Sequence, residues 1–213
     1  MLRIAIDGPG GAGKSTIAKA VAKELFLDYI DTGAMYRAIG YKLAREKVDL
    51  EDQKALQEML DVTDIDFSSG NIILDGEIVN DKIRTPEMSK MASSCSGIKA
   101  VREKLVSLQR RMGENKSLIM DGRDIGNNVL PHAEFKFFIT AAPEERARRR
   151  YAELLQKGDQ VTFEEVLADM NERDEKDRTR ALNPLRKAED AIEIDTTKMS
   201  IEEVIGKIIK EVK

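Results

Sequence analysis

The sequence predicts an α/β fold in which a five-stranded parallel sheet is flanked by helices. The chain opens with an apolar, β-branched segment, a glycine-rich loop and a segment with helical apolar spacing. Further short apolar segments alternate with helical ones, which favours parallel strand pairing. With 213 residues, of which 41% are hydrophobic, the chain can bury the core of one domain. The predicted strands of this sheet cover residues 2–7, 28–32, 117–121, 134–139 and 191–195.

The glycine-rich loop has the pattern of a phosphate-binding loop. Residues 8–15 match G-x-x-x-x-G-K-[ST] at every required position, between a predicted strand and a predicted helix over residues 16–26. Such glycines let backbone N–H groups and the helix dipole face phosphate oxygens. Lys14 is expected to reach the β- and γ-phosphates of a nucleotide, and the Ser15 hydroxyl to bind Mg²⁺, whereas the alternative is a turn without a ligand. The candidate nucleotide-binding residues are Gly8, Pro9, Gly10, Gly11, Ala12, Gly13, Lys14, Ser15 and Thr16.

The composition argues against several classes of protein. The 35 Lys+Arg nearly balance the 39 Asp+Glu, which is not typical of a nucleic-acid coat protein or a polybasic membrane binder. Cys95 is the only cysteine and His132 the only histidine, so neither an intramolecular disulfide nor a Cys/His zinc site is expected. No apolar run approaches the ~20 residues of a membrane span, and the chain begins with a core strand. We expect a cytoplasmic monomer that binds small molecules, and neither nucleic acid nor a membrane.

The second predicted strand is followed at once by a helix over residues 33–46. Arg37 lies one turn inside that helix, near the positive end of its dipole, where a bound anion would be stabilised. An exposed surface arginine is the alternative interpretation.

The character of the chain changes after a predicted helix over residues 51–61. Residues 64–67, 71–74 and 77–79 are short alternating or apolar segments, which predict a small antiparallel meander. They are separated by Ser68-Ser69-Gly70 and by Asp75-Gly76, and the second pair is a strong signal for a tight hairpin. The meander has too little apolar material to fold alone, so it should pack against its host.

A third cluster of polar residues follows the predicted strand over residues 117–121. Helices are predicted from Thr85 and over residues 98–112 before it. Because ligands gather at the carboxyl ends of parallel strands, Asp121 and the Gly122-Arg123-Asp124 segment should lie near the phosphate-binding loop. Asp121 then suits an outer-shell position on Mg²⁺, and a plain turn acid is the alternative.

The helix that begins at Pro143 is rich in arginine. Arg146, Arg148, Arg149 and Arg150 should repel one another unless an anion is present. This predicts a phosphate-gripping lid, with a solvated surface helix as the alternative.

The next helix begins with a capping box at Thr162. Arg173, Asp177 and Arg180 fall at i, i+4 and i+7, on one face of it. They form either ordinary surface ion pairs or a polar face directed at a sugar and a phosphate. Pro184 ends this helix, and Ser200 caps the last one.

A phosphate-binding loop leaves three classes open: a switch GTPase, an ATPase module and a small-molecule kinase. The nearest string to the guanine-reading Asn-Lys-x-Asp motif, at residues 115–118, lacks the Asp. An oligomeric ATPase would need a longer chain, so the small size and the arginines favour a kinase. A kinase for another acceptor and a binding module without turnover remain as alternatives.

The chain resembles the bacterial cytidylate kinases of the nucleoside monophosphate kinase superfamily, over its whole length. The motifs that carry the resemblance lie at residues 8–16, 31–37 (Asp-Thr-Gly-Ala-Met-Tyr-Arg), 121–126 (Asp-Gly-Arg-Asp-Ile-Gly) and 173–180 (Arg-Asp-Glu-Lys-Asp-Arg-Thr-Arg). The resemblance implies one P-loop kinase domain, with a core over residues 1–62, 96–145 and 182–213, a monophosphate-binding insert over 63–95 and a lid over 146–162.

The resemblance also implies transfer of the γ-phosphoryl group of ATP to CMP and dCMP, with Mg²⁺ at Ser15 and, through water, at Asp121. Lys14 with lid residues Arg149 and Arg150 would be catalytic. Asn127-Asn128 stand where many relatives continue with a threonine, which leaves that loop's geometry open. The implied CMP-binding residues are Arg37, Arg123 and Arg180 for the phosphate, Ser93, Arg102 and Asp124 for the base, Thr32 in an assisting role, and Arg173 and Asp177 for the sugar.

Overall fold

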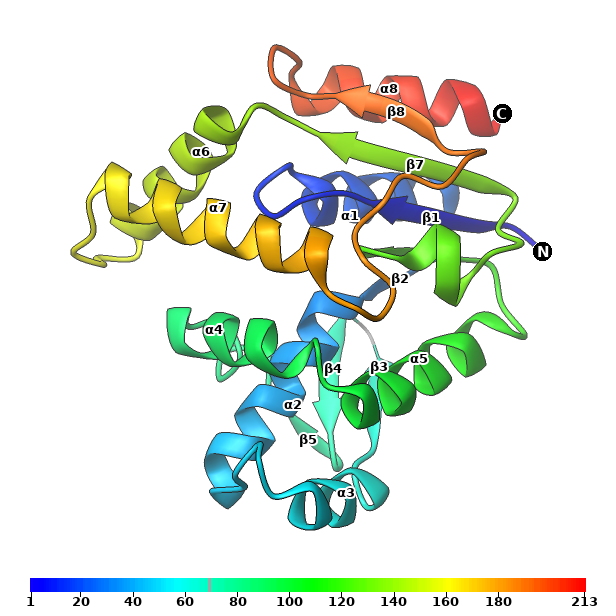
Figure 1. Ribbon diagram of the computed structural model, residues 1–213. Coiled ribbons are helices and arrows are strands. Elements are labelled where there is room, and N and C mark those ends of the chain that lie inside the picture. The colour runs from blue at the N-terminus through cyan, green and yellow to red at the C-terminus, as the bar shows by residue number, and fades with distance from the viewer. Residues whose placement is uncertain (69) are drawn as a thin grey trace. The chain divides into compact units, whose positions relative to one another are not determined.

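The structure is a computed structural model that describes residues 1–68 and 70–213 (Figure 1). The chain forms two compact units. The first unit comprises Met1–Tyr29 and Lys116–Lys213, and the second comprises Ile30–Asn115. Within the described residues, no helix is long and apolar enough to cross a membrane.

A five-stranded sheet with the order β2-β6-β1-β7-β8 lies at the centre of the first unit, and its β2 strand leads into the second unit. The strand β1 pairs in parallel with β6 on one side and β7 on the other, and β7 pairs in parallel with β8. This confirms the α/β fold with its five-stranded parallel sheet. The strands are β1 (Arg3–Asp7), β2 (Asp28–Asp31), β6 (Leu118–Gly122), β7 (Phe135–Thr140) and β8 (Ile192–Asp195).

Two helices of the first unit, α1 and α8, contact each other, and their apolar faces belong to one core with the sheet. Ile6, Phe137 and Ile139 from the strands and Val204 and Ile208 from α8 are buried in this core. The helices α6 and α7 pack side by side (Figure 1). The first unit contains α1 (Lys14–Leu25), the π-helical turn η1 (Ile125–Val129), α6 (Pro143–Gln156), α7 (Phe163–Thr179) and α8 (Ile201–Val212).

The carboxyl ends of neighbouring strands bring two of the predicted motifs together. The strand β1 runs directly into the glycine-rich loop, and Ile6 of β1 lies in register with Asp121 of β6. The capping boxes predicted at Thr162 and Ser200 are both present, which fixes the starts of α7 and α8.

The second unit combines helices with the predicted antiparallel meander. The strands are ordered β3-β4-β5, and β4 packs against α2. Asp75 and Gly76 both have positive φ, 50° and 82°, as a tight hairpin requires, and the buried ammonium of Lys42 lies 2.6 Å from the Asp75 carboxylate. Ser69 of the other predicted turn lies outside the described residues. The elements are α2 (Thr32–Glu46), α3 (Gln53–Asp61), β3 (Ile65–Ser68), β4 (Asn71–Leu74), β5 (Glu77–Ile78), α4 (Pro86–Cys95) and α5 (Lys99–Gly113).

Candidate active site

Lys14 lies at the start of α1, where the glycine-rich loop ends. Its ammonium is buried and donates a hydrogen bond to the Pro9 carbonyl at 2.6 Å. The pKa of Lys14 is lowered to about 7, mainly by burial and also by the positive charges of Arg123 and Arg173, while the negative charges of Asp121 and Asp7 oppose the shift. Positive charge therefore converges on this loop, and a bound anion would relieve it.

Asp121 offers an oxygen-rich environment beside the loop. Its carboxylate is buried and accepts hydrogen bonds from the Ser15 hydroxyl at 2.9 Å and the Tyr29 hydroxyl at 2.8 Å. Asp121 lies within β6, so the turn-acid alternative is wrong. Oxygen ligands of this kind suit Mg²⁺, which takes its remaining ligands from substrate phosphates and water.

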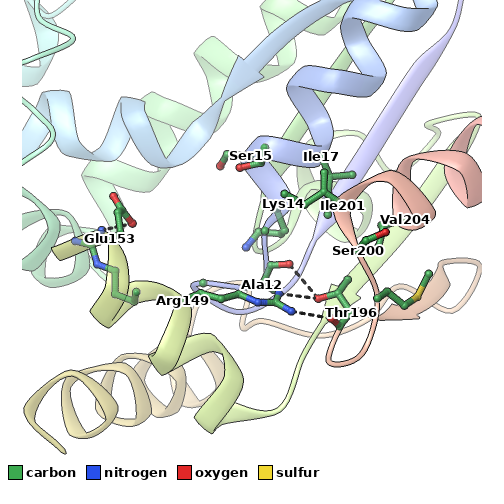
Figure 2. A pocket seen from close by; sticks show the side chains of 15 residues that line it. Ala12, Lys14, Ser15, Ile17, Arg149, Glu153, Thr196, Ser200, Ile201 and Val204 are labelled. Carbon is green, nitrogen blue, oxygen red and sulfur yellow. Dashed lines mark hydrogen bonds and ion pairs between the residues drawn. The ribbon is translucent and has the colours of Figure 1, made fainter. Parts of the chain in front are cut away.

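A cavity of about 530 Å³ opens beside the loop (Figure 2). This volume is within the range of small-molecule sites. Arg149 reaches across it and donates to the Thr196 hydroxyl at 3.2 Å and the Thr196 carbonyl at 2.8 Å. The cavity is lined by Gly11, Ala12, Gly13, Lys14, Ser15, Thr16 and Ile17 of the loop and α1, by Arg149, Arg150 and Glu153 of α6, and by Thr196, Met199, Ser200, Ile201 and Val204 near the carboxyl end of β8.

Sequence reasoning missed Thr196. Its buried hydroxyl also donates to the Thr140 carbonyl at 3.1 Å and lies 3.4 Å from the Ala12 carbonyl, so it ties the loop to the end of β7. The signal that could have found it is its place directly after the last predicted strand, which is the same rule that selected Asp121.

The arginines of α6 differ from one another in their surroundings. Arg149 and Arg150 line the cavity, whereas Arg148 is not among its lining residues. Their predicted mutual repulsion is wrong, because acids from the same helix and from α7 are placed between them. The ion pairs are Arg146 with Asp174 at 2.7 Å, Arg148 with Glu145 at 2.6 Å, Arg149 with Glu145 at 3.2 Å and Arg150 with Glu153 at 2.8 Å.

The candidate CMP-binding residues of the first unit form a network of ion pairs. Arg123 donates to Asp177 at 2.8 Å, and Arg180 pairs with Asp124 at 3.0 Å. Burial would lower the pKa of Arg123, but the charge and hydrogen bond of Asp177, together with the charges of Asp174 and Asp121, outweigh burial and raise that pKa. Likewise burial would raise the pKa of Asp177, but Arg123 and Arg173 hold it below its ordinary value.

Arg180 does not lie on the helix face where the sequence predicted it. The helix α7 ends at Thr179, and Arg180 is its C-cap residue with an extended backbone, φ −56° and ψ 140°. Its guanidinium folds back onto the Asn183 carbonyl, with an Nε to oxygen distance of 2.8 Å. The chain leaves the helix here because Pro184, four residues on, cannot continue it.

The segment after Asp124 forms the π-helical turn η1, which the sequence did not predict. Asp7 at the end of β1 accepts hydrogen bonds from the backbone N–H groups of Ile125 and Gly126, both at 2.8 Å. Burial raises the pKa of Asp7 to about 6, although these two bonds oppose the shift. Asn128 fits this turn because its side-chain amide donates to the Asp124 carboxylate at 3.0 Å. Asp7 therefore positions the candidate base-reading segment, a role signalled only by its place at a strand end.

The remaining candidate CMP-binding residues lie in the second unit, and two of them sit at the start of α2. Thr32 is buried, and Arg37 donates to Asp31 at 3.1 Å. The Arg37 side chain is 21% exposed and its buried Nε has no hydrogen-bond partner among the described residues, so it is not an ordinary surface arginine. It retains a donor that a phosphate oxygen could use.

The other two lie on α4 and α5. Ser93 is partly buried on α4. The buried guanidinium of Arg102 donates to the Ser96 carbonyl at 3.3 Å and lies over the Tyr36 ring at 5.9 Å.

The lone cysteine and histidine take no part in these groups. Cys95 is buried, which raises the pKa of its thiol to about 12, so it is a poor nucleophile. His132 is exposed in a turn before β7.

The parallel sheet with its glycine-rich loop between β1 and α1 is the fold of a P-loop protein. Two solved structures show the same fold: a shikimate kinase from Bacteroides thetaiotaomicron (TM-score 0.52, 16% identity, 99% of this chain and 98% of that chain covered) and an uncharacterized protein from Eubacterium ventriosum (TM-score 0.54, 16% identity, 99% and 97% covered). The family model for cytidylate kinase matches residues 4–213. The chain therefore belongs to the cytidylate kinase family, and it is a kinase.

Relatives named cytidylate kinase are about half identical to this chain over nearly their whole length. A cytidylate kinase from Clostridioides difficile is 51% identical over 211 residues, 99% of this chain and 98% of the relative. A cytidylate kinase from Caldicellulosiruptor saccharolyticus is 52% identical over 213 residues, with 98% and 94% covered. This confirms the resemblance found in the four sequence motifs.

Proposed function

We propose that the protein transfers the γ-phosphoryl group of ATP to CMP or dCMP, giving ADP and CDP or dCDP. The observation that carries the proposal is that Lys14 is buried at the end of the loop with the positive charges of Arg123 and Arg173 near it. Burial first, and these two charges second, lower the pKa of the lysine to about 7. A single unit thus brings the lysine of an ATP loop close to arginines of the acceptor motifs. Two phosphate groups brought together for transfer would supply the missing negative charge.

On the ATP side, the backbone N–H groups of residues 8–16 and the Lys14 ammonium would hold the phosphates, and the cavity beside them would hold the rest of the nucleotide. Ser15 and Asp121 fit Mg²⁺ because their oxygens already lie 2.9 Å apart. These two side chains would hold Mg²⁺ beside the phosphates of ATP, and the positive charge of the ion would offset negative charge that develops during transfer. Arg149 and Arg150 line the cavity and would stabilise the transferring group.

On the acceptor side, we assign the CMP phosphate to Arg37, Arg123 and Arg180, because guanidinium groups bind phosphate oxygens in pairs. Asp124 would accept a hydrogen bond from the exocyclic amine of cytosine, while Ser93 and Arg102 donate to its acceptors. Thr32 would assist them. Arg173 and Asp177 would bind the sugar hydroxyls.

The reaction requires no covalent nucleophile. A phosphate oxygen of CMP would attack the γ-phosphorus in line, so that catalysis consists of positioning and charge stabilisation. A phosphate is already ionised at neutral pH, which removes the need for a general base. The exposed His132 and the buried, protonated Cys95 are consistent with this chemistry.

The test is ADP release from ATP and Mg²⁺ with CMP, dCMP, UMP, AMP, GMP, shikimate or no acceptor. Strong stimulation by CMP and dCMP, with UMP well behind, is the expected result. Stimulation by another acceptor would retain the kinase class and refute the cytosine assignment. If ADP is released at the same rate with every acceptor and with none, the transfer reaction itself is refuted. Light scattering on the same sample tests the monomer that we also propose.

A further inference from the structure

Arg146 is the one arginine of the α6 cluster that is almost fully buried, with a side chain 3% exposed. Its Nε donates to the Ala141 carbonyl at 2.9 Å and one terminal nitrogen donates to the Gly10 carbonyl at 3.0 Å. The other terminal nitrogen lies 2.7 Å from the carboxylate of Asp174, itself 2% exposed. One guanidinium thus joins the end of β7, the phosphate-binding loop and α7.

The loop is also seated on the same two helices by close packing. Gly11 has a positive φ of 73°, and a Cβ there would come within 2.8 Å of the Met170 side chain of α7 and 3.2 Å of Arg146. The backbone of the loop therefore contacts α6 and α7 with no room for a side chain. A shift of the loop at Gly10 and Gly11 would be transmitted to both helices.

The helix α7 then carries the connection to the acceptor residues. Asp177 lies one turn after Asp174 and accepts the 2.8 Å hydrogen bond from Arg123. Arg123 in turn lies against the loop, since a Cβ on Gly10 would be 3.5 Å from its guanidinium. The loop is therefore connected to α7 twice. One connection runs through Arg146 and Asp174, and the other runs through Arg123 and Asp177.

We propose that Arg146 and Asp174 are positioning residues that couple the binding of ATP to the binding of the acceptor. They hold the loop and α7 as one body, so that ordering the loop around phosphate also orders Asp177 and Arg123. Neither side chain lines the cavity, so they act through the groups they hold. The inference rests on the proposed function for the identity of the acceptor.

A charge-free double variant tests the coupling without leaving a buried charge. Arg146→Met or Asp174→Leu alone would strand an ion in the interior, whereas the double variant replaces the buried pair with apolar side chains of similar size. Lys176→Gln with Glu172→Gln is the matched control, an exposed ion pair on the same helix α7. Thermal melting shows whether each variant is folded.

The coupling is measured by calorimetry, as the affinity for the non-hydrolysable ATP analogue AMP-PNP with and without CMP. In the wild type and the control, CMP is expected to tighten AMP-PNP binding about tenfold, a typical size for coupled sites. In the folded double variant, this factor should fall to about one, while the affinity for AMP-PNP alone changes less than about threefold. A folded double variant that keeps the wild-type factor, or a wild type without any coupling, would overturn the proposal.

Two further measurements keep the outcome unambiguous. Arg146→Lys keeps the charge opposite Asp174 but loses the planar group that contacts two carbonyls and this carboxylate at once, so it should lower the coupling even if the double variant does not fold. Unchanged coupling in Arg146→Lys would then refute the proposal. CMP turnover of the wild type is recorded in parallel: a wild type that turns over CMP without coupling refutes this inference alone, and one that turns over no CMP refutes the proposed function and this inference with it.

Discussion

The candidate acceptor-binding residues are held differently in the two units. In the first unit, Arg123, Asp177, Arg180 and Asp124 pair with one another and join the segment after β6 to the end of α7. In the second unit, Arg37 pairs with Asp31, six residues before it on the chain, and its buried Nε keeps an unused donor. In the first unit, the mutual ion pairs hold the candidate side chains in place before any ligand binds. In the second unit, the helices that carry the candidate residues hold them in place, and Arg37 keeps one donor that a ligand could use. Because the side chains of the first unit are already ordered, binding costs less entropy. The same ion pairs also stabilise the unit, so that removal of one partner lowers the free energy of unfolding.

The largest effect should come from the residue on which the charges of the first unit converge. Lys14→Met is expected to lower kcat about 10³-fold, because a preorganised charge at the transferring phosphate is lost. CMP should still bind, since Lys14 belongs to the ATP loop. Steady-state kinetics and calorimetry with CMP measure the two quantities. Lys23→Ala, an exposed lysine on the same helix, is the control, and normal turnover of Lys14→Met would refute the assignment of the loop.

The comparison between the units is tested directly by two matched arginine substitutions. Arg123→Met should lower the free energy of unfolding by about 3 kcal/mol, because the largely buried Asp177 loses its closest partner. Arg37→Met should cost about 1 kcal/mol or less, because Asp31 still accepts the Ala34 N–H as the cap of α2. Both should raise KM for CMP about tenfold or more, since each loses charge-assisted hydrogen bonds to phosphate.

Urea unfolding and CMP titrations at saturating ATP provide these numbers. The exposed arginines Arg178 and Arg84 supply matched Arg→Met controls in the first and second unit. Equal destabilisation by Arg123→Met and Arg37→Met would remove the distinction between the two sets. An unchanged KM for CMP in either variant would remove that arginine from the phosphate site.

A smaller effect is expected at the base-reading end of the first-unit network. Asp124→Ala should lower kcat/KM for CMP about 10- to 100-fold and affect UMP less, because uracil carries a carbonyl where cytosine has its amine. Asn127→Ala is the control: it loses a 2.7 Å bond from η1 to the Arg186 carbonyl without removing a ligand of Asp124. If the preference for CMP over UMP survives in Asp124→Ala, this residue does not read the base.

Local sequence signals predicted the α-helices, the strands and the glycine-rich loop, but not the π-helical turn η1. The strand-loop-helix context of Lys14, the acid at the end of β6 and the Asp75-Gly76 hairpin each depend on neighbouring residues, and the structure has all three. The alternation of strands and helices predicted the parallel pairing of the sheet, but the strand order came from the structure. Such features are fixed by short-range chemistry, so a single sequence carries them.

Partners that are distant in sequence could not be predicted in the same way. Arg146 was grouped with its neighbours on α6 as a phosphate ligand, but Asp174 on α7 and the Gly10 carbonyl hold it in the interior. The π-helical turn has no compositional signature, so the contact of Asn128 with Asp124 had no sequence signal. Which charged residues pair depends on tertiary packing, and this decides whether an arginine binds a ligand or the protein.

The smallest change in the free energy of unfolding is expected at an exposed ion pair, which serves as the reference for the buried ion pairs of the first unit. Arg3 and Glu134 form an ion pair at the other end of the central strands, with side chains 26% and 38% exposed. The hydrogen bonds from Arg3 lower the pKa of Glu134 to about 2, although partial burial opposes the shift. Because the folded-state pKa lies below the unfolded one, this pair stabilises the protein above about pH 4.5 and loses its contribution as the pH falls toward 2.

Glu134→Gln should therefore lower the free energy of unfolding at pH 7 by only about 0.5 kcal/mol, because solvent screens an exposed pair. The difference from the wild type should narrow as the pH is lowered from 5 to about 3, and kcat and KM should not change. Urea unfolding across that pH range measures it. If Glu134→Gln lowers the free energy of unfolding as much as Arg123→Met does, exposed and buried ion pairs of the first unit stabilise it equally, and the buried network does not differ from other pairs. If Glu134→Gln instead lowers the free energy of unfolding only slightly and in a pH-dependent way, the buried ion pairs are the ones that preorganise the first unit, because burial shields them from solvent.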